Sequence, residues 1–521
     1  MLNNRILVIY FFPFILGILT TLSFAPFNLT IVNFLTFPIL LFLVLLIKKR
    51  TESKYRKKKS NKYFFYLGCA FGFGFFLSGN YWISISLTHD DMFIGLIPFA
   101  VILIPLFLSL FFGAAILIVG PFAKKNIFFI LLFSLVFSLF EFLRGNILTG
   151  FPWNLISYSW SWSLESIQVL SLIGTYSLSL ISITFFCIPF LFFKKEINKK
   201  NILFFLSFFI IFLGNYFYGH IKINKDINSF DESLSVKIVS PSFALQDYQN
   251  LSEDLQLKRL IKISNPEKKK KTLFIWPEGI FYESYLENIK KHKDLFSNKF
   301  SKNHLIILGI NNFVNFQELN DEKYFNSFAI LNNELEVIAH YNKINLVPFG
   351  EFLPFENFLS KFGFKKITQG YSSFSAGKTR KIINLEDKFN GMSILPLICY
   401  EIIYSGQIKT KDQLPDLVVN ISEDGWFGKS TGPYQHFTKA VYRSVEEGVF
   451  IARSANKGVS AFIDPNGRVI KSLNIEESGN IEINFPYFRE STLFANHGNK
   501  IFFLIILLYI FLILIFKKTK D

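Results

Sequence analysis

Eight apolar runs, each about as long as a membrane-crossing helix, occupy most of this chain outside one long polar segment. A helix needs about 20 predominantly apolar residues to cross a bilayer. Such runs cover residues 7–23, 28–47, 64–88, 94–122, 126–144, 166–193, 201–219 and 499–516. The pattern predicts a membrane α-helical bundle of eight transmembrane helices.

The charge distribution supports this interpretation. The chain has 521 residues, of which 51% are hydrophobic, and a formal net charge of +16. A charge of that size can indicate nucleic-acid binding, but here the basic residues gather beside the apolar runs, as in Lys48–Arg50, Lys124–Lys125 and Lys517–Lys518. Basic clusters of this kind mark the cytoplasmic ends of membrane helices. We therefore expect a membrane partner and no nucleic acid.

The same rule predicts the topology. With the N-terminus in the cytoplasm and eight crossings, the basic clusters beside the apolar runs fall on the cytoplasmic side, and both termini are cytoplasmic. Three parts result: transmembrane helices 1–7 in residues 1–219, an extracytoplasmic domain in residues 220–498, and helix 8 with a cytoplasmic tail in residues 499–521. The cluster Lys268–Lys271 lies in the polar segment and is expected to form a solvated turn.

The polar segment has the pattern of one α/β domain. Strands are predicted at residues 234–240, 272–278, 304–310, 326–331, 335–341, 392–399, 416–422, 450–455, 459–463 and 479–485, and helices near 250–263, 284–299 and 433–448. Strands mixed with helices over this length indicate sheets covered by helices. The seven histidines are scattered and no Cys/His spacing suits zinc, so no metal site is expected.

Three residues in this segment suggest covalent chemistry. Glu278, Lys343 and Cys399 each stand at the end of a predicted strand, and Cys399 is the only cysteine between the spans. A thiol with a pKa near ~8.5 needs a base before it can act as a nucleophile, and a lysine ammonium can stabilise the thiolate and an oxyanion. These three side chains can build an acyl-transfer site, whereas the alternative is that Cys399 is a buried structural cysteine.

Two further segments have both a functional and a structural interpretation. Glu141 and Arg144 can pair at i and i+3 near the end of a span, and Trp153 follows them, either as part of a functional site or as an interfacial anchor. The apolar segment 352–364 is either a lid that admits lipid or an ordinary packed loop. Its lid candidates are Phe352, Phe355, Phe358, Phe362 and Phe364. His436, at the start of a predicted helix, is either a pocket residue or a packing residue.

Several motifs resemble those of known enzymes. Trp276-Pro-Glu278, Lys343 with Val347–Glu351, Cys399-Tyr-Glu401, Asn420–Phe427 and Arg453–Asn456 are similar to the Glu-Lys-Cys signature and flanking segments of the nitrilase (carbon–nitrogen hydrolase) superfamily. The membrane motifs resemble those of bacterial apolipoprotein N-acyltransferases: Phe24–Phe27, Gly79–Trp82, Glu141–Gly145 and Thr149–Trp153. The segment Ser422–Gly425 departs from the usual Asn-Asp-Ala pattern before Trp426.

The resemblance implies a nitrilase-like αββα sandwich on the periplasmic side of the bacterial inner membrane. It implies transfer of an acyl chain from a phospholipid to the α-amino group of an S-diacylglyceryl-cysteine apolipoprotein, without a cofactor, by a monomer. Glu278 would be the general base, Lys343 the charge stabiliser and Cys399 the nucleophile that forms a thioester. The supporting residues would be Glu351, Tyr400 and Glu401, and the substrate-binding candidates are Trp426, Phe427, Trp276, Glu141, Arg144 and Trp153.

Two other functions are compatible with parts of the pattern. A membrane-tethered carbon–nitrogen hydrolase (amidase) would use the same Glu-Lys-Cys set, because water or an amine can resolve a thioester. A transporter or sensor with a non-catalytic outer domain would keep the spans. Eight spans with their own motifs argue against the first alternative, and the intact Glu-Lys-Cys set argues against the second.

Overall fold

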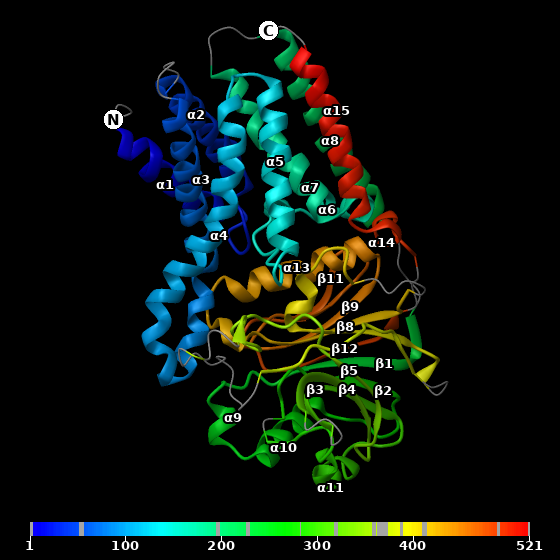
Figure 1. The fold of residues 1–521 in the computed structure, drawn as a ribbon. Helices are drawn as coiled ribbons and strands as arrows, with labels where there is room; N and C mark the ends of the chain where they lie inside the picture. Colours follow the sequence, from blue (N-terminus) through cyan, green and yellow to red (C-terminus); the bar gives the residue numbers. More distant parts are fainter. Residues whose placement is uncertain are drawn as a thin grey trace.

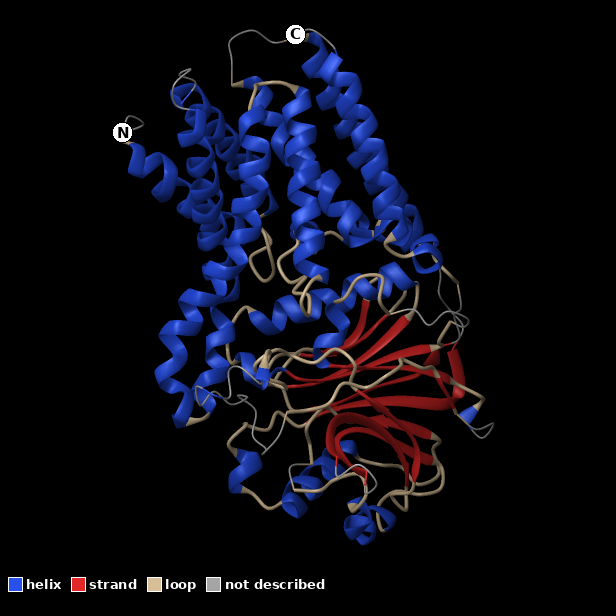
Figure 2. Ribbon diagram, in the orientation of Figure 1, coloured by secondary structure: helices blue, strands red, loops and turns tan. Residues whose placement is uncertain are grey.

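The computed structural model describes residues 4–51, 57–193, 198–225, 230–281, 283–316, 321–356, 361, 373–385, 389–408, 414–486 and 490–518. A bundle of long helices stands on an α/β part built around two stacked sheets (Figures 1 and 2). The start of the first helix and the end of α15 both lie on the side of the bundle remote from the sheets (Figure 1).

All eight predicted apolar segments contain a helix. They are α1 (Phe12–Thr21, preceded by the turn Leu7–Phe11), α2 (Asn33–Thr51), α3 (Lys57–Asn80), α4 (Ile97–Val119), α5 (Ile127–Asn146), α7 (Leu170–Cys187), α8 (Lys199–Ile223) and α15 (Lys500–Lys518). Among the described residues, six helical segments are long and apolar enough to cross a membrane: Thr30–Thr51, Asp91–Phe122, Ile127–Asn146, Leu170–Phe192, Lys199–Ile223 and Lys500–Lys517. The structure thus supports six of the eight predicted spans. The segment Leu7–Thr21 is short and α3 begins with lysines, so the first and third spans stay predictions.

The predicted span at 64–88 extends beyond its helix, whereas the one at 94–122 falls within the apolar helical segment Asp91–Phe122. Helix α3 ends at Asn80, and two tight helical segments, η3 (Tyr81–His89) and η4 (Asp91–Leu96), connect it to α4. We call residues 81–96 the arm, which lies beside the α/β part (Figure 1). Trp82 on the arm is buried against Phe427, with ring centroids 4.7 Å apart. The apolar residues of the arm therefore pack partly on protein.

Within the described chain, twelve strands form two six-stranded sheets, in the orders β12-β1-β2-β3-β4-β5 and β11-β10-β9-β8-β7-β6. Their bounds are β1 Phe230–Ser240, β2 Thr272–Ile275, β3 His304–Phe316, β4 Asp321–Asn332, β5 Val337–Asn342, β6 Ile383–Asn384, β7 Ser393–Ile398, β8 Leu417–Glu423, β9 Phe450–Asn456, β10 Ser460–Ile463, β11 Val469–Leu473 and β12 Gly479–Pro486. All ten predicted strands are present. The two that were not predicted, β6 and β11, lie at the two edges of the second sheet.

The sheets pack face to face, and helices cover their outer faces. Apolar side chains such as Val236, Ile275, Ile394 and Val419 fill the space between the sheets. Helices α10 (Glu253–Ser264) and α11 (Lys293–Ser297) cover the first sheet. Helix α13 (Gly432–Glu447) covers the second sheet, and its core is continuous with that of the bundle. The predicted α/β domain with helix-covered sheets is confirmed.

One predicted helix, at 284–299, is present only in part, over Ile289–Ser297. The chain there forms a turn, a short helical segment at Ile289–His292, and then only α11. Glu253 on α10 accepts hydrogen bonds from the Ser284 backbone N–H at 3.1 Å and from the Ser284 hydroxyl, and it contacts His292 Nε2 at 2.8 Å. These contacts hold the segment against α10 and replace the expected regular helix.

Candidate active site

Glu278, Lys343 and Cys399 lie at one edge of the sandwich. Glu278 follows β2, Lys343 follows β5 and Cys399 follows β7. Strands β7, β8 and β9 are mutually parallel, so their carboxyl ends lie at the same edge. The two sheets meet at this edge, because the backbone N–H of Glu423, the last residue of β8, donates to Glu278 Oε2 at 3.0 Å.

The backbone near Glu278 and Cys399 is shaped for close approach. Gly309 on β3 lies against the Glu278 backbone, and a Cβ at this glycine would stand 2.6 Å from Glu278 Cα. Cys399 has a φ of 48°, a left-handed conformation that non-glycine residues adopt at an energetic cost. The strained turn directs the thiol away from the course of β7.

Lys343 is held by two carboxylates. Its Nζ lies 2.9 Å from Glu351 Oε1 and 3.4 Å from Glu278 Oε1, and the side chain is only 1% exposed. Burial by itself would lower the pKa of this ammonium, but Glu278 and Glu351 outweigh that effect and raise it well above the ordinary value. Lys343 is therefore a fixed positive charge in the site.

Asn326, which the sequence analysis missed, joins the same group. Its Nδ2 donates to Glu278 Oε1 and to Glu351 Oε1, each at 2.7 Å. The pairing of β4 with β5 places it across from Lys343, whose backbone N–H donates to Asn326 O at 2.9 Å. The other oxygen of Glu351 accepts from the Val347 N–H at 2.8 Å. The two carboxylates are thus oriented from several sides.

The Cys399 thiol is buried and un-ionised. Burial is the main cause that raises its pKa, and the negative charge of Glu278 adds to the effect, whereas Lys343 lowers it. A thiol of this kind becomes a nucleophile only when a base takes its proton at the moment of reaction. The negative charge of Glu278 disfavours ionisation of the thiol, and the positive charge of Lys343 favours it.

Glu401 connects the turn after Cys399 to the chain that follows Lys343. Its side chain is fully buried, and Oε2 accepts from the Ile398 N–H at 2.9 Å. Oε1 accepts from the Tyr341 hydroxyl at 2.6 Å, from the Ile344 N–H at 3.0 Å and from Arg380 Nη2 at 3.0 Å. Glu401 has no free oxygen for a substrate, so its role is to position the other two elements.

Tyr400 and a second polar network lie beside Cys399. The Tyr400 hydroxyl donates to Gly150 O at 2.9 Å, which joins the turn at Cys399 to the loop after α5. His436 Nε2 lies 3.3 Å from Cys399 O, and its Nδ1 lies 2.9 Å from Asp424 Oδ1. Burial and the nearby Arg453 lower the pKa of His436 to about 4. His436 is fully buried, so the packing interpretation of this residue holds and the pocket interpretation does not.

The aromatic candidates separate into two groups. Trp153 is buried, its Nε1 donates to Gln435 Oε1 at 2.7 Å, and its ring lies 6.2 Å from that of Phe427. Trp426 is half-buried beside His89, at 5.6 Å between ring centroids. The candidates Trp153, Trp426 and Phe427 therefore remain near the edge of the sandwich that carries Cys399.

Trp276, by contrast, points to the other face of its sheet. It is fully buried among Phe296 and Phe300, and its Nε1 donates to Ser264 Oγ at 2.9 Å. The Glu278 carboxylate instead meets Asn326, Lys343 and the Glu423 N–H between the sheets, so Trp276 and Glu278 do not share a surface with a substrate. This placement removes Trp276 from the substrate-binding candidates.

Glu141 and Arg144 attract each other, but the described part of the chain shows no direct salt bridge between them. Both side chains are buried, but Glu141 accepts from the Ile156 N–H at 3.0 Å and from the Ser179 hydroxyl. Arg144 Nη1 donates to Phe151 O, and the guanidinium lies 5.0 Å from the Phe76 ring centroid. These residues hold loops of the bundle in place, because tertiary partners outcompete the local one.

The lid segment is described only in part. Phe352 is half-buried, and its carbonyl accepts from the Phe349 N–H at 2.8 Å. Phe355 is 76% exposed, with a φ of 53°. Phe358, Phe362 and Phe364 lie outside the described residues.

Comparison with known proteins agrees with this architecture. Residues 16–188 match the family model "Apolipoprotein N-acyltransferase N-terminal domain", and residues 263–485 match "Carbon-nitrogen hydrolase". The solved structure of Nit3 from Saccharomyces cerevisiae, a nitrilase-superfamily member, matches with a TM-score of 0.36 and 16% identity, over 50% of this chain and 92% of that chain. The family-model match at residues 263–485 puts the α/β part in the carbon–nitrogen hydrolase class, joined to a bundle of long apolar helices.

Curated relatives specify the family further. Apolipoprotein N-acyltransferases of Rickettsia prowazekii and Rickettsia bellii are 34% and 35% identical to this chain, with 96% of both sequences covered in each case. The enzyme of Brucella melitensis is 31% identical over 91% of this chain and 89% of its own length. The chain belongs to the apolipoprotein N-acyltransferase family, and it is an acyltransferase of the membrane.

Proposed function

We propose that this enzyme moves an acyl chain from a phospholipid to the α-amino group of an S-diacylglyceryl-cysteine apolipoprotein, through a thioester on Cys399. The observation that carries the proposal is the cluster of Glu278, Lys343 and Glu351 beside a buried thiol, in a domain whose core is continuous with apolar helices. The reaction as proposed uses no cofactor, because the phospholipid itself is the activated donor.

In the first half-reaction, Glu278 takes the thiol proton as the Cys399 sulfur attacks the ester carbonyl of the phospholipid. Lys343 stabilises the oxyanion of the tetrahedral intermediate. When the intermediate collapses, the ester C–O bond breaks, Glu278 returns the proton to the leaving alcohol, and the thioester remains. Glu351 and Asn326 act by keeping Glu278 and Lys343 oriented.

In the second half-reaction, the free α-amine of the apolipoprotein attacks the thioester carbonyl. Glu278 accepts a proton from the amine, the C–S bond breaks, and the thiolate regains that proton as the amide forms. Water would give hydrolysis at the same step, as in an amidase. Phe427, Trp426 and the lid residues Phe352 and Phe355 are proposed to shield the thioester and to contact the acyl chain.

The proposed topology follows from charge. The basic clusters beside the spans favour eight crossings, cytoplasmic termini and a periplasmic domain at residues 220–498, in a bacterial inner membrane. A lipid-facing site would be useful, because removing a chain from the bilayer costs about 0.8 kcal/mol per CH₂. One complete site per chain is compatible with a monomer.

The decisive test is mass spectrometry of the enzyme and of a lipopeptide. Incubation with phospholipid alone should add an acyl mass to the Cys399 peptide, and addition of an S-diacylglyceryl-cysteinyl peptide should transfer that mass to its N-terminus. Cys399→Ala should abolish both, whereas Cys69→Ala, a substitution of a half-buried cysteine in α3, should abolish neither. Transfer that survives Cys399→Ala would refute the thioester route.

A further inference from the structure

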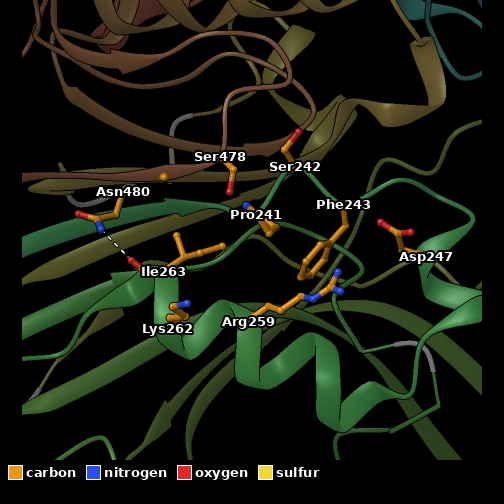
Figure 3. A pocket seen from close by; sticks show the side chains of 10 residues that line it. Pro241, Ser242, Phe243, Asp247, Arg259, Lys262, Ile263, Ser478 and Asn480 are labelled. Carbon is orange, nitrogen blue, oxygen red and sulfur yellow. Dashed lines mark hydrogen bonds between the residues drawn. The ribbon is translucent and has the colours of Figure 1, made fainter.

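A cavity of about 540 Å³ lies beside the catalytic edge. Loop 241–243, Asp247, residues 478–480 and the α10 residues Arg259, Lys262 and Ile263 line it. Figure 3 shows Arg259 and Lys262 rising from α10 on one side of the cavity, with Ser242, Ser478 and Asn480 on the other. Cavities of this size bind small molecules or a few residues of a peptide.

The lining is electrostatically unbalanced. Arg259 and Lys262 lie one helical turn apart, both exposed, and neither forms an ion pair with any residue that the structure describes. The one acidic group, Asp247, already accepts from the Ala244 N–H through Oδ2 at 2.9 Å. Two cations and one carboxylate leave the lining with a net positive charge, which favours an anionic occupant.

The cavity is one strand away from Glu278. Strand β1 runs parallel to β2, so its carboxyl end, which leads into loop 241–243, lies at the same sheet edge. Asn456 accepts from the Phe243 N–H at 2.9 Å and donates to Glu423 Oε2 at 2.8 Å. The Glu423 N–H in turn donates to Glu278 Oε2. The wall of the cavity is thus hydrogen-bonded to the catalytic group through two residues.

We propose that this cavity binds acidic residues in the polypeptide of the lipoprotein acceptor, a refinement that rests on the proposed function. Helix α10 lies on the side of the sandwich remote from the bundle (Figure 1), out of reach of a lipid head group, whereas an acceptor peptide must leave the site toward water. The path from the catalytic edge to the cavity crosses one strand spacing of about 4.8 Å and one layer of about 10 Å. An extended peptide covers about 3.3 Å per residue, so this path corresponds to about three to five residues. The acidic residues would therefore follow the lipidated cysteine by that number of positions.

The test compares acceptors that differ only in charge. Three S-diacylglyceryl-cysteinyl peptides carry Asp-Asp, Ser-Ser or Lys-Lys at the fourth and fifth positions, and kcat/KM is measured with the full-length enzyme and one phospholipid donor. The wild type should favour the acidic over the basic peptide by about three- to tenfold at low ionic strength, and less at high salt. Arg259→Glu with Lys262→Glu should invert this preference.

Lys258→Glu with Lys269→Glu is the matched control, because both lysines are exposed and neither lines the cavity. It should keep the wild-type preference. An unchanged ratio in the Arg259/Lys262 variant, or an equal change in the control, overturns the acidic-peptide site. If the wild type acylates none of the peptides, the proposed function itself fails, whereas acylation without charge preference removes only the cavity proposal.

Discussion

Lys439 on α13 is a buried lysine. It is 2% exposed, and its Nζ lies 4.0 Å from the Trp153 ring centroid and 4.6 Å from that of Tyr158. No carboxylate stands within ion-pair distance of it in the described parts of the chain. Burial, followed by the positive charges of Arg443 and Arg144, lowers the pKa of Lys439 well below its ordinary value.

We predict that Lys439→Met stabilises the protein at neutral pH. Methionine fills nearly the same volume, so no large cavity forms. The lost contact with the two rings contributes at most about 2 kcal/mol, whereas burying an ammonium ion costs several kcal/mol. The difference is a gain of about 1–3 kcal/mol, or a rise in Tm of several degrees.

The pH dependence gives the sharper test. Because the folded state releases the Lys439 proton at a lower pH than the unfolded state does, the unfolded state holds more protons between the two pKa values. Wild-type stability should therefore rise with pH through this window, up to about 10.4, and the advantage of Lys439→Met should shrink. Tryptophan fluorescence of the purified protein at pH 7, 8.5 and 9.5 measures both Tm values.

Lys258→Met, at an exposed position of α10, is the control and should leave Tm unchanged at every pH. A Tm for Lys439→Met several degrees below that of the wild type at pH 7 would refute the argument. That result would mean that the ammonium is charged and has a stabilising partner.

Three further predictions concern buried charges and their partners. Burial disfavours the charged form of Glu253, but hydrogen bonds from His292 and Ser284 outweigh that effect and lower its pKa to about 2. Glu253→Gln should therefore lower the free energy of unfolding by about 3 kcal/mol at neutral pH. In acid unfolding experiments this difference should vanish as the pH falls from about 4.5 to 2. Arg443→Met removes the ion-pair partner of Glu446 and should destabilise the protein by about 3–5 kcal/mol in thermal unfolding. The double variant Arg443→Met/Glu446→Met should recover most of this loss. A single variant as stable as the wild type would contradict the prediction. Asn326→Leu should lower kcat about 10- to 100-fold with little change in KM in steady-state kinetics, and an unchanged kcat would show that the shared donor does not orient the carboxylates.

Burial made most strands predictable from the sequence, and the two strands that were missed are short or exposed. Strands such as β7 and β8 are entirely buried and stand out as apolar runs. Strand β11 exposes four of its five residues, and β6 has only two residues, so neither has a hydrophobic pattern to detect. Both strands depend on the hydrogen bonds of a neighbouring strand, which the local sequence does not encode.

The three proposed catalytic residues could be predicted because strand ends converge at one sheet edge. Asn326 could not be predicted, because its position opposite Lys343 depends on the pairing register of β4 and β5. Residue pairs counted outward from the turn between these strands go out of step at the irregularity between Ile330 and Leu331. Glu141 and Arg144 show the opposite error. Their spacing suggested a local pair, but a buried side chain takes whichever partner the tertiary structure supplies.

Helix α13 connects the α/β part to the helical bundle. One side of the helix covers the second sheet and brings His436 to the Cys399 carbonyl. Its end contacts the bundle, where Glu446 accepts from the Thr175 N–H at 2.7 Å, at the point where Gly174 breaks helix α7. Because one rigid helix holds both contacts, packing fixes the position of the Cys399 turn relative to the helical bundle. The bundle therefore helps to position the candidate site.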